Sequence, residues 1–576
     1  MKRIIRRSAA AHDKLLTSHP VLERILRSRG VLSMESLDYS LIRLLPFSSL
    51  MHIDVAARFL ADIVERQQKI LIVGDFDADG ATSTALSIRA LKALGANNID
   101  YLVSNRFNYG YGLTPELVDV AKTFQPDVIM TVDNGISSLS GVAAAKKAGI
   151  RVIITDHHLA PPQLPEADVI VNPNQEGDAF PSKALAGVGV VFYILLALRA
   201  ELRQRHWFQR QSIAEPNLAH FLDIVALGTV ADVVPLDDNN RILVAHGLKR
   251  IRAGKCVAGI RALLSVAKRV EQNATTQDLG FAVGPRLNAA GRMDDMSIGI
   301  ECLLTDNFDA ALVLAEQLDA FNQERKAVER DMQSQAVQSL KSLSLTPDQS
   351  LPLGLCFFDE SWHQGVIGIL ASRLKDRTHR PVIAFASESG SVVKGSARSI
   401  SGVHIRDMLV EVDAHYPGLI LKFGGHAMAA GLSLLKSNIT LFEQAWNVIL
   451  ARHIDPCLLE KVIHTDGELA CEDLTLRFAE MLEDSGPWGQ QFPEPLFDGR
   501  FLIVDEKILA GKYVKFSLMP EYSDKILDGV AFSVDLDTWP FQKCALAHLV
   551  YRLDINQFRE RRKLQLIIEQ IEPVRF

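Results

Sequence analysis

The chain has 576 residues, of which 48% are hydrophobic and 23% are charged, the composition of a folded protein rather than a disordered one. Acidic residues outnumber basic ones, 69 to 62, which gives a net charge of −7. A protein that coats nucleic acid through its overall charge would be basic, so any nucleic-acid contact must come from a local groove. At roughly 150 residues per domain, the length predicts three or four domains.

The N-terminal segment and the cysteines indicate the cellular compartment of the protein. The segment MKRIIRRSAAAHDKLL is basic but lacks the apolar core of a signal peptide. The longest apolar run, residues 187–198, is shorter than the roughly 18–20 residues of a membrane span. Six cysteines lie far apart without a CxxC motif, as in proteins with reduced thiols. We expect a soluble cytoplasmic protein with no membrane contact.

From about residue 69 to 235, short β-rich runs alternate with helical patterns. Continuous apolar runs separated by helices are typical of strands buried on both faces of a parallel sheet. In such sheets ligands bind outside the carboxyl ends of the strands. The expected strands are 69–74, 99–103, 127–132, 151–155 and 167–171.

The remaining chain predicts two further modules and a long helix. Residues 308–344 contain no Gly or Pro and are rich in charge, which predicts one helix about 50 Å long. Residues 351–450 form a second α/β pattern. The tail has five β-like runs in about 115 residues, compatible with a small barrel of the OB type. The expected strands are 353–358, 381–386 and 419–421, then runs near 499–505, 511–518, 526–534, 545–554 and 564–571.

The first strand runs into GDFDADG, which places Asp75, Asp77 and Asp79 within five residues. Carboxylates this close repel one another unless cations neutralise them, and hard divalent metals prefer oxygen ligands. A solvated acidic turn with a helix N-cap is the alternative for this motif taken alone.

Later segments add the same residue types. The third strand ends in Asp133, the fourth in Asp156, His157 and His158, and Asp232 follows another apolar segment. Each could be a turn or surface group, but together they predict one site at one sheet edge. Mixed Asp and His ligation suits Mn²⁺ and related ions, and two such ions can hydrolyse phosphodiesters by activating water. The absence of a Walker A or GxGxxG motif argues against nucleoside-triphosphate and dinucleotide chemistry.

These motifs resemble a known family. GDFDADG, DNG, DHH, GTVADVVP and GGHAMAAG together resemble the DHH phosphoesterase superfamily with its DHHA1 companion domain. PRLNAAGR, the long helix and the OB-like tail resemble the members that degrade single-stranded DNA. The resemblance implies a metal-dependent exonuclease that removes mononucleotides 5′→3′, with two Mn²⁺ or Mg²⁺ ions, in DNA repair and recombination.

The resemblance also implies roles for individual residues. Asp133 would bridge two ions, and His158 would stabilise the scissile phosphate or move a proton. Asp75 and Asp156 would orient ligands and waters around the reacting groups. One position departs from smaller relatives, which have a histidine where this chain has Val73. The implied metal ligands are Asp77, Asp79, Asp133, His157 and Asp232.

Several other residues are candidates for binding phosphate. Arginine suits bidentate contact with phosphate oxygens, and a glycine turn can present backbone N–H groups to an anion. Gly424, Gly425 and His426 are expected between a strand and an Ala-rich helix start. A structural arginine paired with a carboxylate, or a turn chosen for packing, remains the alternative. The resemblance implies a pocket for a terminal 5′ phosphate, and the candidates are Arg286, Asn288, Arg292, Ser396, Arg398, Gly425 and His426.

In the tail, Lys512, Tyr513, Lys515 and Phe516 and the run 559–563 are candidates for a strand-binding face. The alternative places the aromatics in the barrel core and the charges on a solvated loop.

The expected architecture is a parallel-sheet DHH domain joined by a long helix to a second α/β domain (DHHA1), plus an OB-like barrel. The expected partners are single-stranded DNA with a 5′ end and, as further candidates, a single-strand-binding protein and a helicase; a monomer is expected.

Two other functions stay open: a phosphodiesterase for short oligonucleotides or cyclic dinucleotides, and a strand-binding protein with an inactive catalytic domain. The expected divisions are an N-terminal extension packing on the catalytic core (1–68), a DHH domain (69–235), a connector (236–345), a DHHA1 domain (346–455) and an OB-like domain (456–576).

Overall fold

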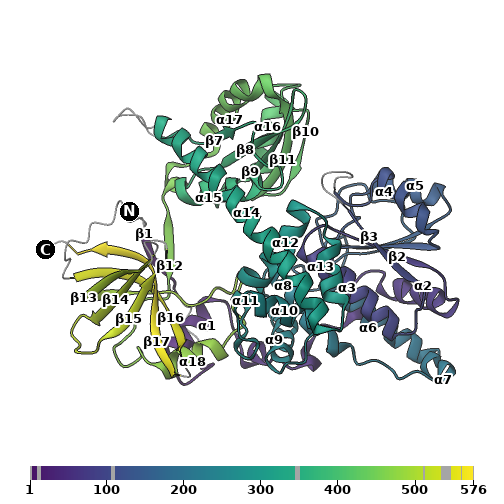
Figure 1. Cartoon of the computed structure of the whole chain (residues 1–576), viewed down its shortest axis with the longest axis horizontal. Helices are drawn as coiled ribbons and strands as arrows, with labels where there is room; N and C mark the ends of the chain where they lie inside the picture. Colours follow the sequence, from purple (N-terminus) through teal and green to yellow (C-terminus); the bar gives the residue numbers. More distant parts are fainter. Residues whose placement is uncertain are drawn as a thin grey trace. The chain divides into compact units, whose positions relative to one another are not determined.

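The computed structural model describes residues 3–8, 15–104, 111–343, 351–509, 513–532, 546–558 and 561–574. The chain folds into two compact units. The larger unit contains residues 4–291, 295–316 and 464–576, and the smaller unit contains residues 292–294 and 317–463. Figure 1 shows the elements of each unit.

A five-stranded parallel sheet is the centre of the larger unit, and its strand order is β3-β2-β4-β5-β6. Every residue of β2 and β4 is buried, as expected for apolar, largely β-branched strands covered on both faces. After β2 the chain forms β3 on one side of it and then crosses to form β4 on the other side, so the sheet has a switch point between β2 and β4, where ligands bind in such folds. The strands are β2 (Ile70–Gly74), β3 (Ile99–Val103), β4 (Val128–Val132), β5 (Arg151–Thr155) and β6 (Val169–Val171).

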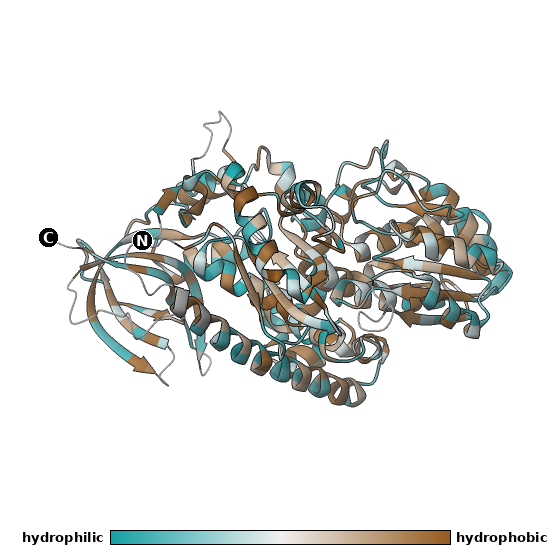
Figure 2. Cartoon of the chain, turned by 90° about the horizontal axis from the view of Figure 1, so that it is seen from above, coloured by the Kyte–Doolittle hydropathy of each residue, from teal (hydrophilic) through white to brown (hydrophobic). Residues whose placement is uncertain are grey.

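Helices cover both faces of this sheet. Alternate strand side chains, among them Leu71, Val73 and Ile129, pack against α4 and α5, while α3 and α6 contact the strands from the other face. In Figure 2 brown and teal residues alternate along the helices, and brown residues also run along many of the strands. The helices before the long helix are α1 (Pro20–Ser28), α2 (Ile53–Glu65), α3 (Ala78–Ala93), α4 (Pro115–Ala121), α5 (Leu139–Lys147), α6 (Gly187–Gln204), α7 (Trp207–Gln211), α8 (Leu222–Ala231), α9 (Asp238–Arg252), α10 (Ala258–Val266), α11 (Thr276–Asp278), α12 (Gly284–Met293) and α13 (Ser297–Leu304).

The long helix predicted over 308–344 is confirmed as α14 (Phe308–Leu343), and its residues from 317 onward belong to the smaller unit. The smaller unit contains a five-stranded sheet of order β10-β11-β9-β8-β7, in which only the β7–β8 pair is parallel. Its elements are β7 (Leu355–Phe358), α15 (Ile367–Thr378), β8 (Val382–Ser389), β9 (Val392–Arg398), α16 (Ile405–His415), β10 (Lys422–Gly425), β11 (Ala429–Leu435) and α17 (Ile439–His453).

The strand expected at 419–421 is wrong, because these residues precede β10. Leu419 and Ile420 are apolar because they fill the core beside α16 and α17, not because they pair in the sheet. The Ala-rich helix start expected after His426 is also wrong, because residues 429–435 form β11, whose residues alternate between buried and accessible. Pairing with β9 and β10 outweighs the helix propensity of its alanines.

The predicted C-terminal barrel is confirmed as a closed barrel of order β13-β14-β15-β17-β16, with α18 (Leu476–Asp484) packed on β16 and β17. For Phe516 the alternative holds: its side chain is 1% exposed and lies in the barrel core, not on a strand-binding face. Lys515 points outward and lies 3.6 Å from Asp528, whereas Lys512 falls outside the described residues. The strands are β13 (Phe497–Leu509), β14 (Tyr513–Pro520), β15 (Leu527–Ala531), β16 (Leu546–Phe558) and β17 (Arg561–Pro573).

The N-terminal residues contact two parts of the larger unit. Arg29 forms two hydrogen bonds with buried Asp466, at 2.5 and 2.8 Å, and Arg6 contacts buried Asp498 of β13. The helix α2 packs against α6 and β6 of the parallel-sheet domain. Among the described residues, Arg6 and Arg29 therefore contact the C-terminal part of the chain, and α2 contacts the parallel-sheet domain. Strand β1 (Arg3–Arg6) pairs with β12 (Val462–Thr465).

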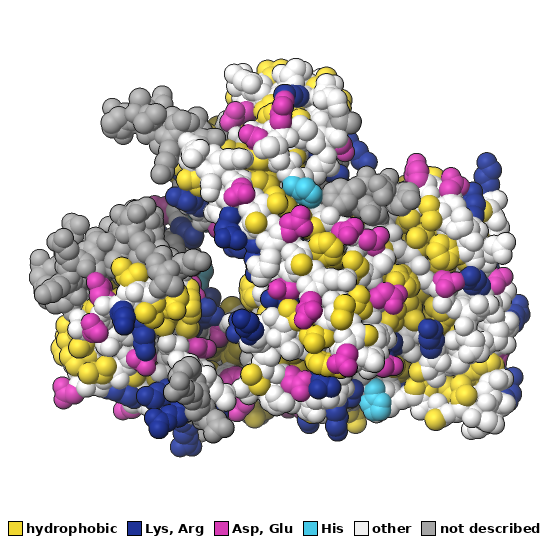
Figure 3. Space-filling model, in the orientation of Figure 1, with side chains coloured by type: hydrophobic (Ala, Val, Ile, Leu, Met, Phe, Trp, Pro, Cys, Tyr) yellow, Lys and Arg dark blue, Asp and Glu magenta, His cyan; other side chains and the backbone are white. Residues whose placement is uncertain are grey.

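On the face shown in Figure 3, basic and acidic side chains are interspersed, in keeping with the small net charge. Among the described residues, no single helix is long and apolar enough to span a membrane. A bent pair of helical segments, Leu41–Ser49 and Ile53–Glu65, has that length and apolarity only when the two are counted together.

Candidate metal centre

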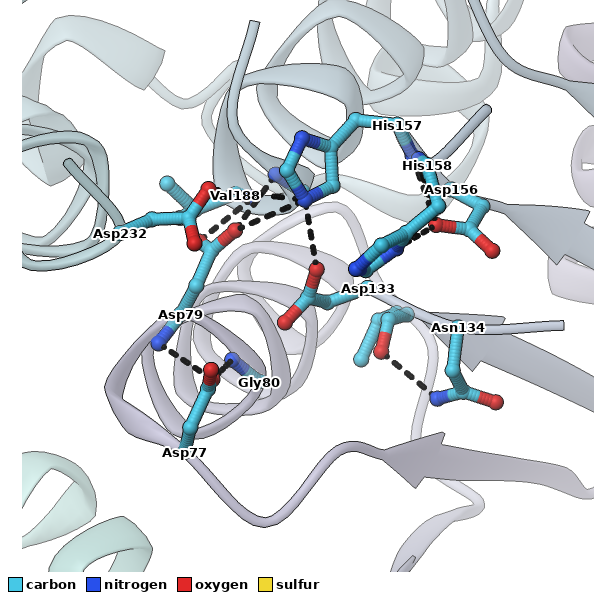
Figure 4. Close-up of polar contacts among 12 residues, drawn as sticks. Asp77, Asp79, Gly80, Asp133, Asn134, Asp156, His157, His158, Val188 and Asp232 are labelled. Carbon is cyan, nitrogen blue, oxygen red and sulfur yellow. Dashed lines mark hydrogen bonds and ion pairs between the residues drawn. The ribbon is translucent and has the colours of Figure 1, made fainter. Parts of the chain in front are cut away.

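Polar side chains from four segments meet where β2, β4 and β5 end (Figure 4). The acidic motif follows β2, Asp133 follows β4, and the two histidines follow β5. Asp232 comes from elsewhere, at the C-terminal end of α8. The convergence at one sheet edge that the sequence predicts is therefore present, and it lies at the switch point between β2 and β4.

The first turn of α3 fixes the acidic motif. Asp77 is the N-cap of α3, and its carboxylate accepts hydrogen bonds from the N–H groups of Asp79 and Gly80, both at 3.0 Å. Gly80 packs against the backbone of Asp75, where a Cβ atom would lie 2.3 Å from the carbonyl oxygen. The motif therefore requires glycine at this position for packing.

The buried carboxylate of Asp79 is held by the start of α6. It accepts hydrogen bonds from the N–H groups of Gly187 at 2.6 Å and Val188 at 3.0 Å. A helix N-terminus stabilises a negative charge, so this arrangement orients Asp79 toward the cluster. Sequence reasoning missed both amides, because a backbone N–H has no side chain that marks its role. The only signal for them in the sequence was the pair of glycines at the start of the apolar helix α6.

His157 lies at the centre of the carboxylates. Its Nε2 atom is 3.1 Å from Asp133 Oδ1, 3.5 Å from Asp232 Oδ2 and 4.0 Å from Asp79 Oδ2 (Figure 4). Burial, followed by the charge of His158, lowers the pKa of His157 to about 4, so its imidazole is neutral at pH 7. Although they lie 3.1 Å apart, His157 Nε2 and Asp133 Oδ1 do not form a hydrogen bond with each other, and neither buried atom has another hydrogen-bond partner among the described residues.

The environment strongly raises the pKa values of several of these carboxyl groups. Burial, together with the nearby charge of Asp77, raises the pKa of Asp75 and of Asp79 to about 7. Burial and the charge of Asp79 raise the pKa values of Asp133 and Asp232 well above the usual range. So many buried acids are compatible with ionisation only if cations neutralise them.

The donor set fits a divalent cation. Three groups of side chains each place their ligand atoms within 4.8 Å of one another: Asp79, His157 and Asp232; Asp133, His157 and His158; and Asp75, Asp77 and Asp133. Carboxylate oxygens with an unpaired imidazole nitrogen suit Mn²⁺ and Mg²⁺. Asp133 belongs to two of the groups, and one group consists of carboxylates alone. Val73, where smaller relatives have histidine, is buried in the apolar core.

His158 has a different environment from His157. Burial opposes its protonation, but the hydrogen bond to Asp156, 2.7 Å from Nδ1, raises the pKa of His158 to about 9. Asp156 is fully buried, and although burial alone would raise its pKa, the bond from His158 holds the pKa below its usual value. The Tyr111 hydroxyl lies 3.1 Å from His158 Nδ1, a contact that nothing in the sequence indicated. His158 is therefore a cation at neutral pH.

The PRLNAAGR segment forms most of α12 and braces the acidic motif. Asn288 Oδ1 accepts a hydrogen bond from the N–H of Ala78 at 2.8 Å, and Gly291 packs on the Phe76 carbonyl, where a Cβ would lie 1.8 Å away. Arg286 is buried and donates to the carbonyl of Ala282. The structure thus places Arg286 and Asn288 in the unit that holds the acidic residues.

The other phosphate candidates belong to the smaller unit. Arg292 donates to the carbonyl of Gly365 at 3.2 Å. Ser396 and Arg398 share one face of β9, where Arg398 Nη1 lies 3.1 Å from Ser396 Oγ. Gly425 and His426 lie in the β10–β11 hairpin rather than before a helix, and His426 N–H donates to Ala429.

Comparisons with known proteins agree with this geometry. The DHH family N-terminal domain matches residues 69–229, the DHHA1 domain matches 351–451, and the RecJ OB domain matches 465–570. The single-stranded-DNA-specific exonuclease RecJ of Escherichia coli is 52% identical over 555 residues, which cover 96% of each chain. That of Thermus thermophilus is 31% identical over 86% of this chain and 70% of the relative.

Solved structures give the same result. The crystal structure of RecJ from Thermus thermophilus in complex with Mn²⁺ matches with a TM-score of 0.80 and 26% identity, covering 100% of this chain and 80% of that chain. The Mg²⁺ complex matches with a TM-score of 0.75 and 25% identity, covering 100% and 78%. Because about half of the residues are identical to those of curated exonucleases along nearly the whole of both chains, this chain belongs to the RecJ family of DHH phosphoesterases.

Proposed function

We propose that this chain is a metal-dependent exonuclease that hydrolyses single-stranded DNA from its 5′ end to mononucleotides. The observation that carries the proposal is His157 Nε2, a buried nitrogen without a hydrogen-bond partner among the described residues, surrounded by carboxylates of three separate segments. The names of the related proteins support the substrate, since they are single-stranded-DNA-specific exonucleases.

We assign five side chains as metal ligands. Asp133 belongs to two of the three ligand groups, which supports a role as the bridge between two ions. When bound, two divalent ions would lower the pKa of a water molecule and stabilise charge on the phosphate oxygens. The proposed ligands are Asp77, Asp79, Asp133, His157 and Asp232.

The residues next to the proposed ligands set the charge of His158 and the orientation of both histidines. We assign His158 to the scissile phosphate, because its imidazolium, maintained by Asp156, can donate a hydrogen bond to a phosphate oxygen or a proton to the leaving oxygen. Asp156 also accepts hydrogen bonds from the N–H groups of His157 and His158, which fixes their backbone. Asp75, held by Ser104 at 3.1 Å, is placed to orient a water molecule.

Arg398 and Ser396 are proposed to bind the terminal 5′ phosphate. Burial lowers the pKa of Arg398, and no carboxylate of the described residues offsets that burial with an ion pair. Both side chains lie at the start of α15, because a Cβ on Gly368 would lie 2.9 Å from Arg398 Nη2 and 3.0 Å from Ser396 Oγ. A partly buried guanidinium without a carboxylate partner among the described residues, beside a helix N-terminus, is suited to a phosphate. Arg286, Arg292, Gly425 and His426 remain further candidates for contacts along the strand.

End-labelled strands test this function directly. Single strands labelled at the 5′ or 3′ end, incubated with Mn²⁺ or Mg²⁺, should release labelled mononucleotide first from the 5′ end. The H157A variant should be inactive, and circular strands should resist cleavage. Release from 3′ ends first, or cleavage of circles, would refute the proposal. Preferential turnover of a dinucleotide over a long strand would instead favour a small-substrate phosphodiesterase.

An enzyme of this kind acts on strands that have already been separated from their complement. We therefore propose a role in DNA repair and recombination, with a helicase and a single-strand-binding protein as candidate partners. A pull-down with each purified partner, with and without single-stranded DNA, would test these contacts.

A further inference from the structure

We propose that Asn172 and Asn174 position the two histidines of the metal centre by clamping their backbone carbonyl groups. The Asn172 side-chain amide donates to the carbonyl of His158 at 2.9 Å, and that of Asn174 donates to the carbonyl of His157 at 2.5 Å. Two consecutive carbonyls are thus held by two side chains from one turn, the one that follows β6. The inference rests on the proposed function, which makes His157 a ligand and His158 a phosphate contact.

The turn that carries the clamp is itself held in place. Asn172 is fully buried, and its Oδ1 accepts a hydrogen bond from the N–H of Asn174 at 2.7 Å. The ammonium group of Lys183 donates to the carbonyl of Pro173 at 2.6 Å and to that of Asp178 at 2.8 Å. The two amide groups therefore project from a fixed backbone.

The histidines require such an external support. Residues 156–158 follow the end of β5 and belong to no helix or strand, so the sheet does not pair their carbonyls. Asp156 holds the N–H groups of His157 and His158, at 2.7 and 3.1 Å. With Asn174 on the His157 carbonyl and Asp156 on the His158 N–H, the peptide group between the two histidines is held from both sides. Asp156 also holds the peptide group before it and Asn172 the one after it, so these contacts restrict the direction in which each imidazole leaves the backbone.

The consequence for metal binding follows from the distances. His157 Nε2 lies 3.1 Å from Asp133 Oδ1, so a small rotation of the His157 backbone would move this nitrogen away from the carboxylates. Partners that orient metal ligands typically change metal affinity or activity by about 10–100-fold when they are removed. Asn172 and Asn174 touch no carboxylate of the site in the described residues, so their effect must pass through the histidines.

The test uses the full-length protein stripped of metal. Asn174→Ala removes the donor, and Asn174→Asp replaces it with an oxygen that repels the His157 carbonyl. Asn97→Asp is the matched control, because Asn97 is exposed and its amide bonds only to Gln67 among the described residues. For each protein we would measure Mn²⁺ affinity by calorimetry, the EPR spectrum of bound Mn²⁺, the melting temperature in EDTA, and kcat and KM on single-stranded DNA.

Both Asn174 variants should bind Mn²⁺ about 10–100-fold more weakly, with a changed EPR spectrum and a lower kcat, while KM and the melting temperature in EDTA stay close to those of the control. The added charge of aspartate would by itself favour a cation, so weaker binding in Asn174→Asp isolates the geometric effect. Wild-type affinity and spectrum in both variants, or a fall in the EDTA melting temperature that accounts for the whole loss, would overturn the clamp. Wild-type protein that binds no Mn²⁺ would instead overturn the proposed function.

Discussion

Replacing Gly187 with alanine should disable the metal centre through steric displacement of Asp133. A Cβ at Gly187 would lie 2.6 Å from Asp133 Cβ, 2.8 Å from its Oδ1 and 2.9 Å from its Cα. Carbon atoms in contact are normally about 3.5–4.0 Å apart, so one partner must move by about 1 Å. A rotamer change cannot relieve the contact, because the Asp133 Cα itself is involved.

The expected magnitudes follow from that displacement. Overpacking of this kind typically costs about 1–3 kcal/mol of stability. A misplacement of about 1 Å in a catalytic group costs about 10²-fold in rate, so we expect kcat to fall by about that factor. Gly187 also presents its N–H to Asp79, so a shift of the α6 start would move a second carboxylate.

Gly189, two residues later in the same helix, provides the matched control. The three atoms nearest to a Cβ there belong to the side chain of Leu185, the nearest being its flexible Cδ2 atom at 3.0 Å. G189A should keep wild-type activity and melt at the same or a higher temperature, since alanine favours a helix over glycine by about 1 kcal/mol. The assay compares Mn²⁺ affinity, kcat and melting temperature in EDTA. Activity of G187A within threefold of wild type would refute the steric argument.

Three further predictions follow from the described geometry. The folded-state pKa of Asp79 is about 7, above the ~3.9 of an unfolded chain, so between these pH values the folded metal-free protein binds more protons than the unfolded chain. The free energy of unfolding should therefore fall as pH rises through this window. In melting scans with EDTA, D79N should weaken this pH dependence. R398A should weaken binding of 5′-phosphorylated strands more than of 5′-hydroxyl strands in a fluorescence titration, and an equal loss for both ends would remove the terminal-phosphate assignment. F516A should cost about 3–5 kcal/mol in denaturant unfolding, whereas K515A should cost under about 1 kcal/mol; equal values would contradict the placement of Phe516 in the barrel interior.

Local patterns in the sequence determined much of this protein. The runs that became β2, β4 and β5 are continuous and apolar, so they specify buried parallel strands without reference to the rest of the chain. Since parallel strands end at one edge, the acids and histidines that follow them had to converge there, and the structure brings Asp79, Asp133 and His157 together as expected.

Tertiary contacts decided what local patterns could not. The segment 429–435 begins with two alanines and still forms β11, because pairing with two neighbouring strands outweighs a weak intrinsic preference. Phe516 alternates correctly for a strand, but only closure of the barrel determined which face became the interior. The groups that support the site act through backbone atoms that every residue has, or lie far in sequence from the residues they hold. They are the amides of Gly187 and Val188 and the side chains of Asn172 and Asn174. Apart from the glycines that open α6, the sequence carries no signal for these contacts, because they depend on where two distant segments of backbone meet.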